Sequence, residues 1–210
     1  MSTLARRTPT AIAYAAVVLL GAVGPWPVFV IVLLAFFIIG LVELARLSAW
    51  RPLPTLGGAL YLGLGLGALG ALWANTHPWL LAVLLATWAA DTVAYLVGSQ
   101  IGRHHLAPRI SPGKTWEGSI AGFAAAAGVI AAVGMAGPAG IVVAVGIGPV
   151  GLAGDLFESW LKRRAQVKDS GALLPGHGGV LDRIDSLLFV GPFVWVVVAV
   201  LGRPDGMMGR

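Results

Sequence analysis

The sequence contains no cysteine, and only 11% of its 210 residues are charged. The absence of cysteine excludes a disulfide framework and any chemistry that needs a thiol. Soluble domains carry roughly 25% charged residues, and this chain lacks the charged exterior that such a domain presents to water. The low charge therefore excludes a soluble nucleic-acid-binding protein. It also excludes a disordered chain, because disorder requires a polar or strongly charged composition.

Hydrophobic residues make up 58% of the chain and occur in long continuous runs. Such runs are typical of membrane-spanning helices, whereas outer-membrane barrels show alternating segments of ~10 residues. The sequence therefore predicts an all-α polytopic membrane protein. About seven transmembrane helices are expected, at 10–24, 27–47, 56–74, 78–97, 119–136, 140–156 and 187–201. Pro25 and Pro27 separate the first two, which leaves a re-entrant hairpin as an alternative for that pair.

The 14 Lys and Arg residues are distributed unevenly among the connections between these spans. Twelve lie in the amino-terminal segment and in the second–third, fourth–fifth and sixth–seventh connections, and the other two lie in the tail. The positive-inside rule then places the amino terminus in the cytoplasm and the carboxyl terminus outside. No cleavage site is evident after the first run, so we expect a retained helix there. The chain is thus predicted to be a multi-pass protein of the cytoplasmic (inner) cell membrane.

Glycine is abundant within the predicted spans, with examples at Gly63, Gly65, Gly67 and Gly70. A nucleotide-binding glycine loop needs a strand before it and a helix after it, and that context is missing here. In an apolar helix, small residues let neighbouring helices approach closely. We therefore expect these glycines to serve helix packing.

Acidic residues are concentrated in one part of the chain, with seven of the nine between Asp91 and Asp185. The segment 155–185 carries five acids together with five bases, which a simple positive-inside loop does not explain. Mixed charge beside a membrane suits a metal ion and a polyanionic substrate.

The sixth predicted span ends in the sequence GDLFESWLKRR. If the helix continues past the membrane surface, Asp155, Ser159 and Lys162 share one face. A carboxylate, a hydroxyl and an ammonium in one line suit a Mg²⁺-bound phosphate. The alternative is a solvated helix end with an ion pair between Glu158 and Lys162.

A glycine-rich motif, LPGHGGVLDRID, follows before the last span. Glycines surround His177, so the backbone there can approach a ligand closely; alternatively, His177 is a structural turn residue. Asp182 and Asp185 share a face if the segment is helical, and two carboxylates entering a membrane helix need a compensating cation. Because no other His or Cys accompanies them, the hard ligand set favours Mg²⁺ over zinc.

A third motif, ISPGKTWEG, precedes the fifth span at 110–118. It is not a P-loop, because Pro108 stands where that motif requires glycine. Its Ser111, Lys114, Thr115 and Glu117 lie at the expected start of a helix, where a phosphate site is plausible. The alternative is a capping segment in which Thr115 caps the helix.

One acid, Asp91, lies inside the fourth predicted span. An ionisable side chain within the membrane is by default a functional candidate. The alternative is a buried hydrogen bond between helices.

Taken together, these motifs resemble those of the phosphatidate cytidylyltransferases, also called CDP-diglyceride synthases. The resemblance is carried by Ser159–Asp185, SWLKRRAQVKDSGALLPGHGGVLDRID, whose spacing matches the family signature. The segments SPGKTWEG and WAADTVAYLVGSQIG are similar to two further family patterns, although Gly113 stands where the family commonly has Lys or Asn. The resemblance covers roughly residues 80–190. We accordingly divide the chain into N-terminal transmembrane helices (1–76), a catalytic transmembrane region with cytoplasmic loops (77–202) and a tail (203–210).

The resemblance implies that CTP and membrane phosphatidate react to give CDP-diacylglycerol and pyrophosphate, without nucleic acid as a partner. It also implies Mg²⁺, a second, monovalent cation such as K⁺, and a homodimer. Metal ligands carry over to Asp155 and Asp182, with Asp185 close by. The catalytic signature positions are Lys162, Arg163, Lys168, Asp169 and His177. The candidates for substrate binding are Ser111, Lys114, Thr115, Glu117, Ser159 and Asp91.

Three alternative functions remain at this stage. A CTP-dependent polyprenol or lipid kinase would transfer the γ-phosphate, and an ether-lipid cytidylyltransferase would perform the same transfer on another lipid. An ion transporter would also place acids in membrane helices, but it predicts an inverted repeat and a continuous polar path. No repeat is visible, and the charges cluster on one side.

Overall fold

The structure is a computed structural model, and it describes residues 3–173 and 178–202. Its helices are α1 (Thr3–Val23), α2 (Trp26–Leu47), α3 (Pro52–Ile101), α4 (Trp116–Ala132), α5 (Gly137–Arg164) and α6 (Leu181–Leu201). A two-stranded antiparallel sheet, β1 (His105–Ala107) and β2 (Ser111–Thr115), joins α3 to α4. The predicted tail at 203–210 and His177 lie outside the described residues.

Every predicted span falls on a helix, and two of them, 56–74 and 78–97, form the halves of α3. Between the halves the backbone of Thr76 is non-helical, with φ −150° and ψ 56°, and Pro78 follows. Proline has no N–H to donate and its ring crowds the preceding turn, so it ends or bends a helix. α3 is therefore two membrane-length helices that meet at a kink.

The helices have the length and composition of a polytopic membrane protein. Within the described residues, α2, α3, α5 and α6 are long and apolar enough to cross a membrane, while α4 and Ala13–Val23 are shorter apolar helices. The all-α prediction is confirmed, with one addition. The β1–β2 hairpin was not expected, because residues 110–118 were interpreted as a helix start.

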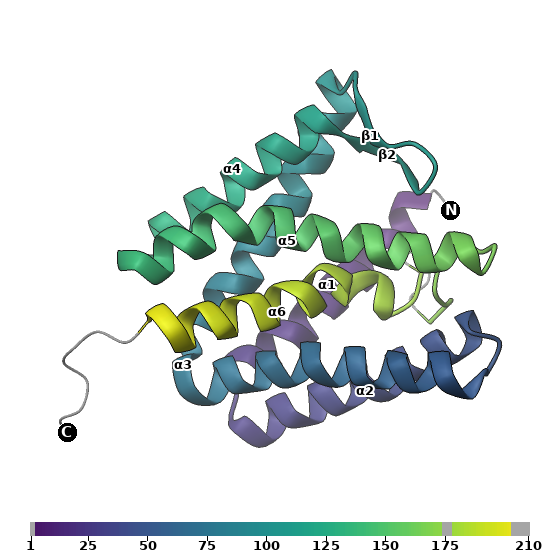
Figure 1. Ribbon diagram of the computed structural model, residues 1–210, viewed down its shortest axis with the longest axis horizontal. Coiled ribbons are helices and arrows are strands. Elements are labelled where there is room, and N and C mark those ends of the chain that lie inside the picture. Colours follow the sequence, from purple (N-terminus) through teal and green to yellow (C-terminus); the bar gives the residue numbers. More distant parts are fainter. Residues whose placement is uncertain (1–2, 174–177, 203–210) are drawn as a thin grey trace.

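The connections predicted to carry the basic residues gather at one end of the molecule. Figure 1 shows the α2–α3 turn, the hairpin and the α5–α6 segment at the right, with the kink of α3 and the α4–α5 turn at the left. A hydrogen bond joins the end of α5 to the hairpin turn, since Nε of Arg163 donates to the carbonyl oxygen of Ile110 at 3.1 Å. This end is called the basic end below.

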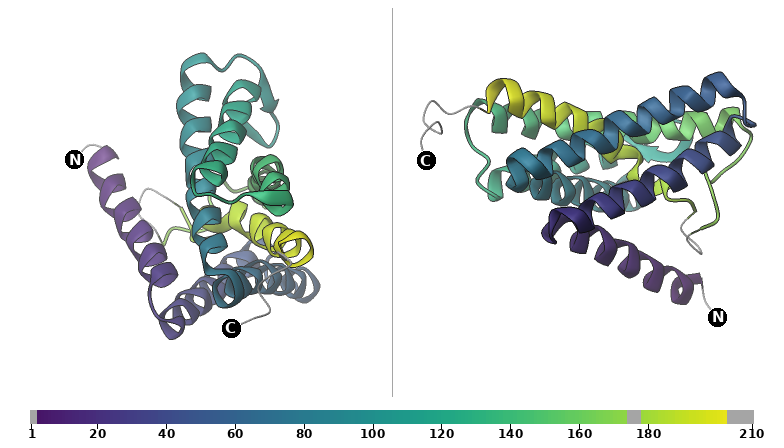
Figure 2. Two further views of the ribbon diagram at one scale, coloured as in Figure 1. Left: turned by 90° about the vertical axis from the view of Figure 1, so that its left-hand side faces the viewer. Right: turned by 90° about the horizontal axis from the view of Figure 1, so that it is seen from below.

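Small residues let the helices around the site pack closely. A Cβ atom on Gly118 or Gly122 of α4 would meet the carbonyl oxygens of Ala94 and Ala90 on α3, and one on Gly154 of α5 would meet the backbone of α6. Such close approach is the usual role of glycine in membrane helices. Figure 2 shows the resulting group of α3, α4, α5 and α6, with α1 standing apart from it.

The predicted packing role of glycine holds at some positions and not at others. Gly65 packs tightly on Leu188 of α6, and Gly70 contacts Leu33 of α2. Gly67 has no atom within 4 Å of the place where a Cβ would stand. Part of the glycine-rich face of α3 is therefore open.

The arrangement predicts which loops share a side of the membrane. The chain has no cysteine, so single cysteines can be placed at Arg109 in the hairpin turn and at Ala136 before α5, both exposed. With the basic end in the cytoplasm, a membrane-impermeant maleimide will label Ala136→Cys in intact cells. The same reagent will label Arg109→Cys only after lysis, and the reverse pattern would overturn the orientation.

Candidate active site

A cavity of about 520 Å³ opens near the basic end, between α3, α4, α5, α6 and the hairpin. It collects eight of the residues singled out in the sequence: Asp91, Lys114, Thr115, Asp155, Lys162, Asp169, Asp182 and Asp185. The other described candidates, Ser111, Glu117, Ser159, Arg163 and Lys168, lie outside the cavity lining. The structure thus brings three separate sequence motifs to one place.

The hairpin and α5 meet through an ion pair at this cavity. Nζ of Lys114 lies 2.5 Å from Oδ2 of Asp155, and both side chains are about one-quarter exposed. The hydroxyl of Ser159 donates to the other oxygen of Asp155 at 3.3 Å. Asp155 and Ser159 therefore share a helix face as predicted, and the cation beside them comes from the hairpin.

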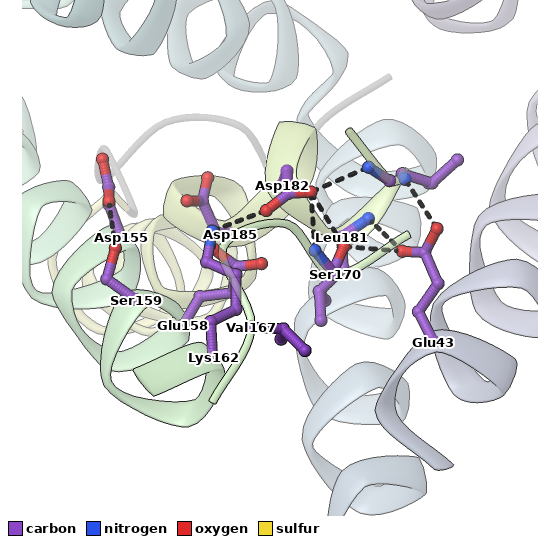
Figure 3. A network of polar contacts seen from close by, with 12 residues as sticks. Glu43, Asp155, Glu158, Ser159, Lys162, Val167, Ser170, Leu181, Asp182 and Asp185 are labelled. Carbon is purple, nitrogen blue, oxygen red and sulfur yellow. Dashed lines mark hydrogen bonds and ion pairs between the residues drawn. The ribbon is translucent and has the colours of Figure 1, made fainter. Parts of the chain in front are cut away.

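Lys162 bridges two carboxylates from different helices (Figure 3). Its Nζ lies 2.5 Å from Oε2 of Glu158, one turn earlier on α5, and 2.5 Å from Oδ1 of Asp182 at the start of α6. The Glu158–Lys162 pair considered as an alternative is present. It does not lie on a solvated helix end, since Glu158 is fully buried.

Asp182 organises the segment between α5 and α6. Its Oδ2 accepts hydrogen bonds from the backbone N–H of Gly179 at 2.7 Å, and from the backbone N–H and the hydroxyl of Ser170, both at 3.0 Å. A Cβ on Gly178 would run into this carboxylate, and φ of Gly178 is +79°, a conformation that favours glycine. Glycine at that position is therefore a requirement of the turn.

Sequence reasoning missed Glu43, a carboxylate of α2 that is only 3% exposed. Its two oxygens accept from the backbone N–H groups of Val180 at 3.1 Å and Leu181 at 2.8 Å. One of them also lies 3.1 Å from the hydroxyl oxygen of Ser170, whose single proton is shared between Glu43 and Asp182 (Figure 3). The first N–H groups of a helix have no partner within the helix, and Glu43 supplies one for α6. Glu43 is the single acid within 27–47, and the rule applied to Asp91 would have found it.

The hairpin motif divides into residues that face the cavity and residues that shape the backbone. The hydroxyl of Thr115 accepts from the N–H of Gly118 at 3.2 Å, so the predicted cap of the helix is present. Glu117 contacts Nδ1 of His104 at 2.6 Å and accepts from its backbone N–H, which holds the base of the hairpin. Lys114 is the hairpin cation that reaches the cavity.

The balance of charged residues in the cavity determines whether it could bind a metal ion. Its lining contains five acids and three bases, Lys114, Lys162 and Arg183. No group of three or more His, Asp or Glu side chains is poised to hold a metal within residues 3–173 and 178–202. Asp155 pairs with Lys114 and Asp182 pairs with Lys162, while Asp185 lines the same cavity. The acid excess nevertheless fits Mg²⁺, which is usually held by one or two carboxylates together with substrate phosphates.

The contacts of Glu43 predict how the start of α6 responds to its loss. Glu43→Ala leaves the N–H groups of Val180 and Leu181 without acceptors, and each unpaired buried donor costs about 1–3 kcal/mol. We expect these amides to exchange with deuterium roughly tenfold faster or more, as measured by mass spectrometry of the peptide that contains them. Glu117→Ala removes a carboxylate at the same end and should leave that peptide unchanged. Unchanged exchange in Glu43→Ala would contradict the assigned contacts.

Comparison with known proteins adds to this geometry. The sequence model described as "Cytidylyltransferase family" matches residues 3–201. The phosphatidate cytidylyltransferase of Brucella abortus is 44% identical over 125 residues, which cover 56% of this chain and 46% of that protein. The enzyme of the same name from Bacillus subtilis is 42% identical over 119 residues, covering 54% and 44%. The one from Thermotoga maritima is 40% identical over 132 residues, covering 58% and 49%. The matched region thus spans about half the length of these relatives.

Proposed function

The chain belongs to the cytidylyltransferase family, and we propose that it transfers the cytidylyl group of CTP to phosphatidate. The products are CDP-diacylglycerol and pyrophosphate. The observation that carries the proposal is the cavity itself, which holds lysines and carboxylates from the hairpin, α5 and α6 at one end of membrane-length helices. The names of the three relatives support the same reaction.

The reaction makes demands that these residues meet. An oxygen of the phosphatidate phosphate forms a bond to the α-phosphorus of CTP, and the bond from that phosphorus to the bridging oxygen of pyrophosphate breaks. The attacking oxygen is already an anion, so no strong base is required. Charge neutralisation and alignment are required instead, and Lys114, Lys162 and Arg183 are the cations that line the cavity.

We further propose Mg²⁺ as the cofactor, with Asp155, Asp182 and Asp185 as the residues that would hold it. When bound, Mg²⁺ would neutralise phosphate charge and orient the triphosphate. Lys114 and Lys162 now pair with two of these carboxylates. With these carboxylates engaged by a metal ion, Lys114 and Lys162 would each have an ammonium group available for phosphate oxygens. The monovalent cation and the homodimer remain expectations from the family resemblance.

The proposed location is the cytoplasmic face of the inner membrane. CTP is water-soluble, whereas phosphatidate remains in the bilayer, and a charged cavity at one end of a helix bundle is accessible to both. The basic end also contains twelve of the 14 Lys and Arg residues, as the positive-inside rule requires of a cytoplasmic face.

Isotope transfer separates this reaction from that of a lipid kinase. A kinase acceptor is a neutral alcohol that needs a base, and Asp169 is the described cavity residue considered for that role. When purified protein is incubated with phosphatidate and CTP labelled at the α-phosphate, we expect the label to enter the lipid and unlabelled pyrophosphate to be released. Label that enters only from the γ-phosphate, with CDP as the soluble product, would establish the kinase reaction instead.

Substitutions at Asp155 test the metal assignment, and because the chain has no cysteine, a single cysteine introduced there is the only thiol. Asp155→Asn should lower turnover roughly 100-fold or more, because metal charge stabilisation amounts to several kcal/mol. Asp155→Cys presents a soft ligand, so we expect low turnover with Mg²⁺ and partial recovery with added Cd²⁺. Near-normal turnover of Asp155→Asn at saturating Mg²⁺ would reject Asp155 as a ligand.

A further inference from the structure

A second hollow at the basic end adjoins the α5–α6 segment. It has a volume of about 840 Å³ and lies between the α2–α3 turn, the start of α3 and the end of α5. Asp169 is the one lining residue that it has in common with the candidate active site. The two cavities are therefore separate sites on either side of one loop residue. This hollow is called the arginine pocket below.

Three guanidinium groups from three segments line the arginine pocket: Arg46 at the end of α2, Arg51 before α3 and Arg164 at the end of α5. Across the described ranges, no carboxylate lies within 4.0 Å of any of the three. Arg164 lies over the ring of Trp160, 5.5 Å from its centroid. Asp169 is the pocket's single acidic lining residue, so the pocket has a surplus of positive charge. Arginine forks match the geometry of phosphate oxygens.

An apolar groove continues from the arginine pocket along α3 and α6. It has a volume of about 600 Å³, runs from Tyr61 to Ala71 on α3, and is closed on the other side by Phe189 and Trp195 of α6. Tyr61 lines both hollows. Ten residues of helix extend about 15 Å, which is half of the ~30 Å hydrocarbon core of a bilayer. The groove thus has the depth of one lipid leaflet.

The groove has free space beside α3 and is open toward the outside of the helix bundle. At Gly67, the space next to the helix is empty for 4 Å. Leu64, beside it, is 70% exposed, so the groove opens sideways.

We infer that an anionic phospholipid of the bilayer binds here, with its phosphate on the three arginines and one acyl chain in the groove between α3 and α6. Tyr61, which lines both hollows, marks the level at which the glycerol backbone would lie. The inference rests on the charge, shape and depth of the site. It does not depend on the proposed reaction, and the occupant is bulk anionic lipid rather than the substrate.

Native mass spectrometry of the detergent-purified protein tests the headgroup half of the site. Phosphatidylglycerol is the probe, since it is anionic but lacks the terminal phosphate that an acceptor needs, and phosphatidylcholine is the neutral comparison. We expect the protein to retain phosphatidylglycerol and not phosphatidylcholine. Basic residues at an anionic surface each contribute about fivefold in affinity, so Arg46→Gln combined with Arg51→Gln should weaken retention about 25-fold.

A matched pair of substitutions controls for total charge. Arg103→Gln combined with Arg109→Gln also removes two arginines from the basic end, outside the pocket, and should leave retention unchanged. Equal losses in the two double variants would overturn the inference, because general surface charge would then explain the binding. Equal retention of phosphatidylglycerol and phosphatidylcholine would overturn it as well. The same holds if phosphatidate, added in a third measurement, is the lipid retained and phosphatidylglycerol is not.

A second comparison tests the acyl-chain half without changing charge. Gly67 and Gly128 are both exposed helical glycines with no atom within 4 Å of a Cβ, but only Gly67 lines the groove. We expect Gly67→Leu to lower phosphatidylglycerol retention and Gly128→Leu to have no effect. Should Gly67→Leu instead break a dimer while lipid retention stays the same, the groove binds a second copy of the chain and the inference is wrong.

Discussion

The geometry of the candidate site depends on the two ion pairs that the ammonium group of Lys162 forms. This group joins Glu158 of α5 to Asp182 of α6, and Asp182 in turn holds the backbone at Ser170 and Gly179. Removing one partner of a buried ion pair costs about 3–5 kcal/mol, because the remaining charge has no compensation. Lys162 is thus a structural cation as well as a candidate for phosphate binding, and both roles use the same three donor hydrogens.

Lysine lines only the candidate active site, where Arg183 is the third cation, whereas arginine alone supplies the cations of the other hollow. Lysines 114 and 162 face carboxylates inside the candidate active site, whereas arginines 46, 51 and 164 line the other pocket. Lysine is a compact point charge on a flexible stem, which suits a site where partners change during turnover. Arginine presents a fixed planar fork, which suits one phosphate held for a long time. The two lysines therefore suit a phosphate that is exchanged during turnover, and the three arginines suit the lipid phosphate inferred for the arginine pocket.

The helices were predictable from the sequence because the apolar runs are long, and the cap at Thr115 followed from its side-chain chemistry. The β1–β2 hairpin was not predictable from the sequence, because β2 has only five residues and contains Pro and Gly, which are depleted in strands. The family resemblance predicted Asp155 and Asp182 as metal ligands, with Asp185 close by, and the three line one cavity. Lys114 pairs with Asp155 and Lys162 with Asp182, and these pairings were not predicted, because side-chain pairing across 20 or more residues is set by tertiary packing. Two contacts cross the predicted boundary between residues 1–76 and 77–202. Glu43 contacts Ser170 in the α5–α6 segment, and the hydroxyl of Tyr14 donates to the carbonyl oxygen of Arg183 on α6.

The position of Glu43 has a consequence for biosynthesis. Its hydrogen-bond donors lie 127 to 138 residues further along the chain, so the ribosome completes α2 long before they exist. Until α6 is inserted, a carboxylate near the end of a membrane helix must remain at the aqueous interface or carry a proton, because an unpaired charge in hydrocarbon is costly. Insertion of α6 is therefore the step that draws Glu43 into the protein interior. The loop of the candidate site acquires its shape at that moment, after α1 to α5 have been synthesised.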